Sequence, residues 1–160
     1  MEPTTKLKIP PTPFNVFCDR MKITICGSVT FVKEMVEVKE RLENLGHKVL
    51  VPHSAEINQD KKYWNQFKAK NRDNFLDIKG ERMIGHFNKI KSSDAVLILN
   101  YDKNEKKNYI GGNTFIEMAI AFEHGKKIFL INPIPKESPY IDEIESMKPF
   151  ILNGELGNIK

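Results

Sequence analysis

The sequence predicts an α/β protein built on a parallel sheet. Three short apolar segments rich in Ile, Leu and Val, at 22–26, 95–99 and 127–131, are bounded by polar residues, as strands buried on both faces are. Segments with apolar residues at helical spacing lie between them, and glycines separate the two kinds. Strands that alternate with helices are joined by right-handed crossovers, so we expect helices on both faces of the sheet.

The first half of the chain supplies two strands and a helix between them. The strand at 22–26 is followed by Gly27 and Ser28 and then by a helix over 30–45, which Gly46 ends. A second strand spans 48–51 and Pro52 closes it. The next stretch, 54–80, is polar and has poor periodicity, so we expect only helical pieces that cover a ligand crevice.

The middle of the chain holds the unit that organises the prediction. A helix over 81–91 has its inner side formed by Met83, Ile84, Phe87 and Ile90. The strand at 95–99 follows, and a helix then begins with Asn113 or Thr114 as N-cap and ends at Gly125. The inner face of that helix is formed by Phe115, Met118, Ala119 and Phe122.

The last part of the chain completes the sheet. A strand at 127–131 is broken by Asn132-Pro133, a short helix spans 140–147, and a fifth strand covers 150–152. The whole pattern predicts a flavodoxin-like or Rossmann-like three-layer sandwich with a five-stranded parallel sheet.

Length and composition predict one domain with an N-terminal extension. The chain has 160 residues, enough for a single core. Residues 1–20 carry four prolines among Thr and Lys, which favours a flexible Pro-rich arm before a domain at 21–160. Met21 is an alternative start.

Composition also excludes several classes of function. No apolar run reaches the roughly 20 residues that span a bilayer, and no signal peptide is visible, so we expect a cytoplasmic protein without membrane contact. The two cysteines, Cys18 and Cys26, have no metal-ligand spacing, so neither a metal site nor a disulfide is expected. The net charge of +4 suits an anionic ligand. The lysines are scattered among acidic residues rather than interleaved with aromatics, which argues against nucleic-acid binding.

The candidate site centres on Glu117. Gly111 and Gly112 allow close approach of a ligand to the backbone. Glu117 falls in the first turn of the predicted helix, at the edge of the sheet where ligands bind, and its carboxylate would face the crevice. An alternative remains open, because Thr114-x-x-Glu117 also matches a capping box, in which the glutamate only caps the helix.

Other strand ends add candidate binding residues. Gly27 and Ser28, between a strand and a helix N-terminus, form either an anion site made of backbone amides or an ordinary tight turn. His53, after the second strand, and Asn100, after the third, fall on the crevice side, where loops carry functional groups. Asn113 follows the glycine pair and completes the set of candidate binding residues.

These segments resemble the nucleoside 2-deoxyribosyltransferase superfamily, which includes the deoxynucleoside 5'-monophosphate N-hydrolases. The resemblance rests on Ile25-Cys26-Gly27-Ser28, on Ser93-Asp94-Ala95-Val96 and on the segment from Gly112 to Ala119. It covers about residues 21–159 and implies that Glu117 is the nucleophile that attacks the anomeric carbon of the sugar. It also implies a nucleoside or nucleotide as the small-molecule partner and a homo-oligomer.

Two positions depart from the family pattern. The family has a second catalytic aspartate eight residues before the Asp that opens the third strand, and counting back from Asp94 reaches His86. Where the family tends to place Asp or Ser six residues before the glutamate, this chain has Gly111. The resemblance therefore leaves His86 either as a catalytic substitute or as an ordinary helix residue.

A reduced form of the family mechanism needs only two side chains. Cleavage of an N-glycosidic bond develops an oxocarbenium-like centre that a carboxylate can trap, while the departing base needs a proton. We expect Glu117 to be ionised by the helix dipole and His86 to be held cationic by the nearby carboxylate. No organic cofactor or metal is implied. Tyr101 and Tyr109 are candidates either for stacking on a base or for core packing.

Three readings of function follow. The first is a deoxyribosyltransferase or a nucleotide N-hydrolase. The second is a phosphoribohydrolase of the lysine-decarboxylase-like family, whose G-G-x-G-T-x-x-E loop is one residue longer than the segment from Gly111 to Glu117. The third is a non-catalytic nucleotide-binding or sensing module, which the departures at His86 and Gly111 favour.

Overall fold

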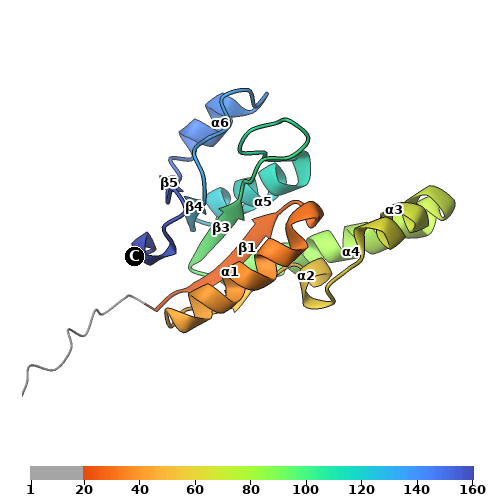
Figure 1. Cartoon of the computed structure of the whole chain (residues 1–160), viewed down its shortest axis with the longest axis horizontal. Coiled ribbons are helices and arrows are strands. Elements are labelled where there is room, and N and C mark those ends of the chain that lie inside the picture. The colour runs from red at the N-terminus through yellow and green to blue at the C-terminus, as the bar shows by residue number, and fades with distance from the viewer. Residues whose placement is uncertain (1–19) are drawn as a thin grey trace, which may run out of the picture.

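A computed structural model describes residues 20–160 and contains one all-parallel sheet (Figure 1). The order of its strands is β2-β1-β3-β4-β5. The strands are β1 (Lys22–Gly27), β2 (Lys48–Leu50), β3 (Ala95–Leu99), β4 (Lys127–Leu130) and β5 (Phe150–Ile151). This order confirms the predicted flavodoxin-like sheet. The proposed Pro-rich arm lies outside the described residues, apart from its last residue.

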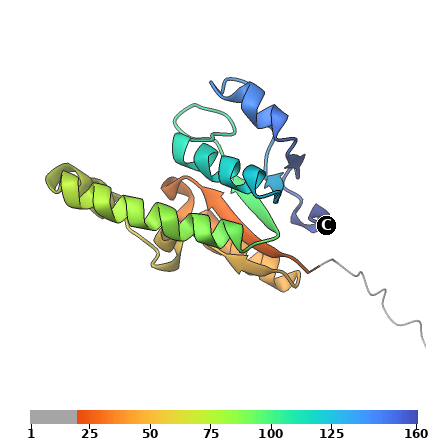
Figure 2. The same cartoon turned by 180° about the vertical axis from the view of Figure 1, so that it is seen from behind.

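Helices cover both faces of the sheet. They are α1 (Val32–Asn44), α2 (His53–Glu56), α3 (Lys61–Lys70), α4 (Arg72–Lys91), α5 (Gly112–Glu123) and α6 (Ile141–Ser146), with 3-10 turns η1 (Val29–Phe31) and η2 (Leu156–Asn158). Helix α1 packs on one face (Figure 1), and α4 and α5 cover the other (Figure 2). Three layers result, as the sequence predicts. Within residues 20–160, no helix combines the length and apolar character needed to cross a membrane.

The pleat of β1 divides its side chains between two hydrophobic clusters. Ile23 and Ile25 belong to the cluster on the α1 side, together with Met35. Cys26 belongs to the opposite cluster, which Ile90 of α4 and residues of α5 and α6 complete. Because successive strand residues point to opposite faces, Cys26 faces α4 and α5.

Helix α4 is twice as long as the sequence predicts. It begins at Arg72 rather than near residue 81, and its first half projects beyond the sheet together with α3 (Figures 1 and 2). A projecting helix buries few side chains, so its sequence lacks the apolar stripe on which the prediction relied. The assignment of Ile84 to the inner face is also wrong, because Ile84 is 60% exposed and His86 is buried instead.

Helix α5 begins earlier than predicted. Its N-cap is Gly111 in an extended conformation, and the amide of Phe115 donates to the carbonyl of Gly111 at 2.9 Å. A cap at residue 113 or 114 is therefore wrong, and Glu117 lies in the second helical turn, not the first. Gly125 follows the helix with a φ of +63°, as expected for a glycine stop. Phe122, expected inside, is 53% exposed.

Candidate functional site

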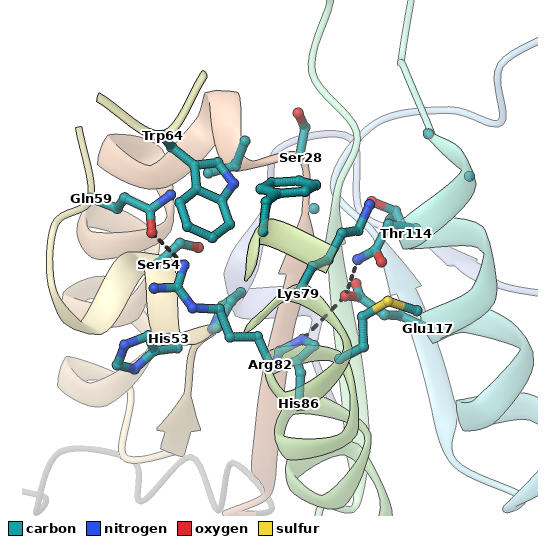
Figure 3. A pocket seen from close by; sticks show the side chains of 18 of the residues that line it. Ser28, His53, Ser54, Gln59, Trp64, Lys79, Arg82, His86, Thr114 and Glu117 are labelled. Atoms are coloured by element: carbon teal, nitrogen blue, oxygen red, sulfur yellow. Dashed lines mark hydrogen bonds and ion pairs between the residues drawn. The ribbon is translucent and has the colours of Figure 1, made fainter. Parts of the chain in front are cut away.

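A pocket lies at the carboxyl ends of β1 and β3, where the strand order reverses (Figure 3). Its volume is about 280 Å³, near the lower end for small-molecule sites. One side is formed by the end of β1 and the start of α5, and the other by α2, α3 and α4. Among the predicted binding residues, those that line it are Gly27, Ser28, His53, Gly111, Gly112 and Asn113.

Glu117 lines this pocket from the second turn of α5 and is only 4% exposed. One carboxyl oxygen, Oε1, accepts a hydrogen bond from Nδ2 of Asn113 at 2.8 Å. The other, Oε2, is buried without a hydrogen-bond partner. The carboxyl group does not reach back to the start of its helix, so the capping-box interpretation fails and an unsatisfied acid remains in the pocket.

His86 faces Glu117 from α4, as Figure 3 shows. Its Nε2 lies 3.8 Å from Oε1 of Glu117, and both side chains are 5% exposed. The same Nε2 lies 3.5 Å from Sγ of Cys26, the buried free cysteine at the end of β1. The structure thus brings His86 beside the acid, and it adds a thiol that the sequence reasoning treated as an ordinary buried residue.

Burial sets the protonation of this group. It raises the pKa of Glu117 to about 8, and the nearby Cys26 thiol and the hydrogen bond from Asn113 oppose that rise only in part. Burial also lowers the pKa of His86 to about 4, with a smaller contribution from the positive charge of Lys89. The expectations of an ionised Glu117 and a cationic His86 are therefore corrected. At neutral pH the pair therefore has one titratable proton, on Glu117, and no net charge.

Ser28 and His53 approach the pocket as the strand ends predict. The hydroxyl oxygen of Ser28 caps η1, accepting from the amide of Thr30 at 3.3 Å, and it also accepts from Nζ of Lys103 at 3.0 Å. His53 begins α2, and its Nδ1 lies 3.3 Å from Oε2 of Glu56. A cation thus stands beside the predicted anion-binding turn.

Gly111 packs closely against the end of the Tyr109 side chain, which a larger residue would displace. A Cβ atom at this position would lie 2.8 Å from the hydroxyl oxygen of Tyr109, closer than real contacts allow. Tyr109 itself lines the pocket. Tyr101 instead packs edge-to-face on Phe31 with ring centroids 5.4 Å apart, so of the two tyrosines only Tyr109 is placed to touch a ligand.

Asn100 is outside the residues that line the pocket. Its Nδ2 donates to the carbonyls of Asn132 and Pro133 at 3.0 and 2.9 Å, and its Oδ1 accepts from the amide of Asn132 at 3.0 Å. These bonds tie the end of β3 to the loop after β4. The side chain is fully used for this purpose, so the structure gives Asn100 a structural position instead of the predicted contact with a ligand.

The residues of the far wall of the pocket were not predicted from the sequence. Lys79 and Arg82 of α4 bring two positive charges to it, and Trp64 of α3 adds an aromatic surface. The guanidinium carbon of Arg82 lies 4.4 Å from the centroid of the Trp64 ring, and a guanidinium nitrogen donates to Oε1 of Gln59. Trp64 and Lys79 come from the stretch with poor periodicity, and Arg82 comes from the helix predicted at 81–91; no spacing pattern singles them out. The pocket as described is cationic, with Glu117 as the one acid among its described lining residues.

Comparison with known proteins gives two solved structures of related shape. One is a 2-deoxyribosyltransferase of the psychrotolerant bacterium Bacillus psychrosaccharolyticus, with a TM-score of 0.46 and 18% identity over 70% of this chain and 72% of that one. The other is the CMP N-glycosidase BcmB of Clostridium botulinum, with a TM-score of 0.46 and 16% identity over 81% of this chain and 84% of that one. No family model matches the sequence, and no curated protein does. We therefore infer function from the side chains of the pocket.

Proposed function

We propose that this protein cleaves the N-glycosidic bond of a nucleoside or nucleoside 5'-monophosphate. One observation carries the proposal: the floor of a cationic pocket holds a buried carboxyl group, Glu117, whose Oε1 is 3.8 Å from Nε2 of His86. Cleavage of such a bond needs a carboxylate that meets positive charge at the sugar and a proton for the departing base. This pair holds both in one place, and the resemblance of residues 112–119 to deoxyribosyltransferases implies the same role for Glu117.

The proton count of the pair matches the reaction. As the bond between the base and C1' breaks, the base takes the electron pair of that bond together with the single proton of the Glu117–His86 pair. The carboxylate left on Glu117 then forms an ester bond to C1'. Water, or a second base, later attacks C1', and the ester bond between C1' and Glu117 breaks. The product leaves as the free sugar or as a new nucleoside, and the proton lost by the attacking group restores the pair. Glu117 holds the proton at first and then acts as nucleophile, and His86 relays that proton to the departing base.

The charge of the pocket favours a phosphorylated substrate. Arg82 and Lys79 line one wall, and Lys103 donates to the hydroxyl of Ser28 on the other. Nothing acidic balances them among the described lining residues except the buried Glu117, which is neutral at pH 7. A 5'-phosphate supplies the missing negative charge, and Trp64, whose ring packs on Phe67 and Phe75 and lies under Arg82, adds an apolar wall.

One observation favours a second candidate, a nucleotide-binding module without turnover. Glu117 has no second carboxylate near it among the described lining residues, and His86 stands where the resemblance places an aspartate. A pocket of this kind could bind a nucleotide and leave the glycosidic bond intact. The two functions differ in a single measurable event, the release of free base.

The test is chromatographic detection of base released from ribo- and deoxyribonucleosides and their 5'-monophosphates, with and without a free acceptor base. We expect wild type to release base and Glu117→Gln to release none above background. Glu123→Gln, a matched change on an exposed residue of the same helix, should behave as wild type. Dependence on an acceptor base would assign a transferase. Nucleotide binding without base release by wild type would refute catalysis and establish the binding module.

A further inference from the structure

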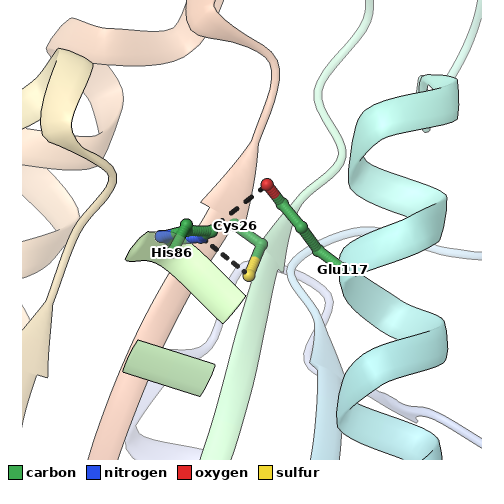
Figure 4. Close-up of side chains that lie close together, drawn as sticks. All are labelled: Cys26, His86 and Glu117. Atoms are coloured by element: carbon green, nitrogen blue, oxygen red, sulfur yellow. Dashed lines mark hydrogen bonds and ion pairs between the residues drawn. The ribbon is translucent and has the colours of Figure 1, made fainter. Parts of the chain in front are cut away.

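Three potential metal ligands from three separate elements converge beside the pocket (Figure 4). Cys26 comes from β1, His86 from α4 and Glu117 from α5, and none is more than 5% exposed. One ligand atom of each lies within 4.8 Å of the other two. The spacing of the cysteines gave no indication of this group, because its members are far apart in the sequence.

The group has unsatisfied polar atoms. Oε2 of Glu117 is buried with no hydrogen-bond partner, and so is Nδ1 of His86. In the described part of the chain, no lysine or arginine forms an ion pair with Glu117. The one basic side chain within ion-pair distance of it is that of His86, which is neutral at pH 7. Buried carboxyl oxygens are nearly always paired, so the unpaired Oε2 leaves Glu117 able to take a further partner beside the thiol and the imidazole.

The distances match tetrahedral coordination. With metal bonds of about 2.3 Å to sulfur and 2.05 Å to nitrogen, the tetrahedral angle places the sulfur and nitrogen ligands about 3.6 Å apart. Sγ of Cys26 and Nε2 of His86 are 3.5 Å apart. The same geometry requires about 3.4 Å between nitrogen and oxygen ligands. Nε2 of His86 and Oε1 of Glu117 are 3.8 Å apart, and the thiol and the carboxyl oxygen lie within 4.8 Å of each other, so the Glu117 side chain has to move toward both ligands to complete the site.

We propose that Cys26, His86 and Glu117 form a three-ligand site for a divalent cation of the zinc class. The donors are one thiolate, one imidazole and one carboxylate, a set that suits zinc rather than magnesium or calcium. Loading exchanges the thiol proton and the carboxyl proton for the cation, so two protons leave and the site stays neutral. His86 and Glu117 line the pocket, which leaves the fourth coordination position open to it.

Metal occupancy and the proposed chemistry exclude one another. A carboxylate bound to the cation cannot form a bond to C1', and an imidazole bound through Nε2 cannot pass a proton. This consequence rests on the proposed function, whereas the binding site itself does not. The cation would therefore act as a reversible inhibitor of base release, and a chelator as an activator.

Cobalt titration of the full-length, metal-free protein tests the site directly. Cobalt reports on zinc-type sites through visible d–d bands and a near-ultraviolet thiolate-to-cobalt charge-transfer band. The background is Cys18→Ser, so that Cys26 is the only thiol. We expect saturation at one equivalent with a charge-transfer band, and displacement of the cobalt by zinc. Absence of the charge-transfer band in this background would overturn the proposal.

Variants separate coordination from folding. Adding Cys26→Ser should abolish the charge-transfer band, and adding Glu117→Gln, which preserves shape, should keep the band but weaken cobalt at least tenfold, the lower bound for loss of even a second-shell partner. Zinc should raise the melting temperature of the Cys18→Ser protein and leave that of the Cys26→Ser variant unchanged. A band that survives Cys26→Ser, or unchanged affinity in Glu117→Gln, would contradict the site. Absence of base release in the presence of a chelator would contradict the proposed function, whereas the cobalt titration tests the metal site alone, so the two claims can be tested separately.

Discussion

Replacing Glu117 by Gln should change how stability depends on pH. In the unfolded chain this carboxyl group loses its proton near its ordinary pKa of 4.5, whereas in the folded protein it keeps the proton up to about 8. Between these two pH values the folded state binds one more proton than the unfolded state, so the free energy of unfolding falls as the pH rises. Glutamine does not titrate, but it can still accept the hydrogen bond from Asn113.

The size of the effect follows from the two pKa values. Their difference, 8 minus 4.5, multiplied by about 1.36 kcal/mol for each pKa unit, gives about 5 kcal/mol. The free energy of unfolding of Glu117→Gln, minus that of wild type, should therefore grow by about 5 kcal/mol in total from well below pH 4.5 to well above pH 8, and about 4 kcal/mol of this growth falls between these two pH values. About 3 kcal/mol of this growth should be complete at pH 7. Subtracting wild type cancels His86 and every other group that titrates equally in both proteins.

Urea unfolding in chelating buffer at intervals between pH 4 and pH 9 measures this difference. Glu123→Gln provides the control, because its side chain is 73% exposed and its difference from wild type should stay flat. A flat difference for Glu117→Gln as well would show that the Glu117 carboxyl titrates alike in the folded and unfolded chains. That result would refute the account of a buried, neutral acid at the floor of the pocket.

Three further outcomes are expected. In the presence of a chelator, the rate constant of base release should fall below about pH 4, where His86 becomes protonated, and above about pH 8, where Glu117 loses its proton. A rate constant that keeps rising beyond pH 9 would contradict the role of the Glu117 proton. Asn100→Ala should lower the free energy of unfolding by about 1–3 kcal/mol in urea titrations and leave KM unchanged, because the buried Asn100 side chain loses its hydrogen bonds with the backbone of Asn132 and Pro133. A raised KM with unchanged stability would restore Asn100 as a binding residue. Arg82→Ala should raise KM for a 5'-monophosphate about tenfold or more and have less effect on the nucleoside, whereas the exposed neighbour change Glu81→Ala should alter neither; equal effects on both substrates would place the phosphate elsewhere.

The parts of the fold with continuous apolar strands could be predicted from the sequence. The strand at 95–99 matches β3, and the strand order follows from alternation with helices. Helix α4 was half missed, because its first ten residues project and bury little besides Phe75. Local pattern cannot report a helix whose stability depends on contacts with another helix that also projects.

Within the site, position was easier to predict than chemical state. The placement of Glu117 beside the crevice follows from a strand, a glycine pair and a helix start, but the predicted N-cap of the helix is two or three residues late. The predicted charges of Glu117 and His86 were both wrong for the same reason. The helix dipole and a neighbouring charge can be inferred from the sequence, whereas the burial of these side chains between α4 and α5 cannot. Cys26 was not predicted as a site residue because its neighbours in the site, His86 and Glu117, are 60 or more residues away in the sequence.

Helix α4 also connects the two ends of the pocket mechanically. Arg82 and His86 are four residues apart, about one turn or 6 Å along the same side of a rigid rod. The projecting half of that rod meets α3, where Arg82 lies over Trp64, while its inner half sets the distance from His86 to Glu117. A ligand contact that shifted α4 at Arg82 would therefore also shift His86 relative to Glu117, because both residues belong to one helix. Binding of the outer part of a ligand and alignment of its reacting end would thus be coupled through α4.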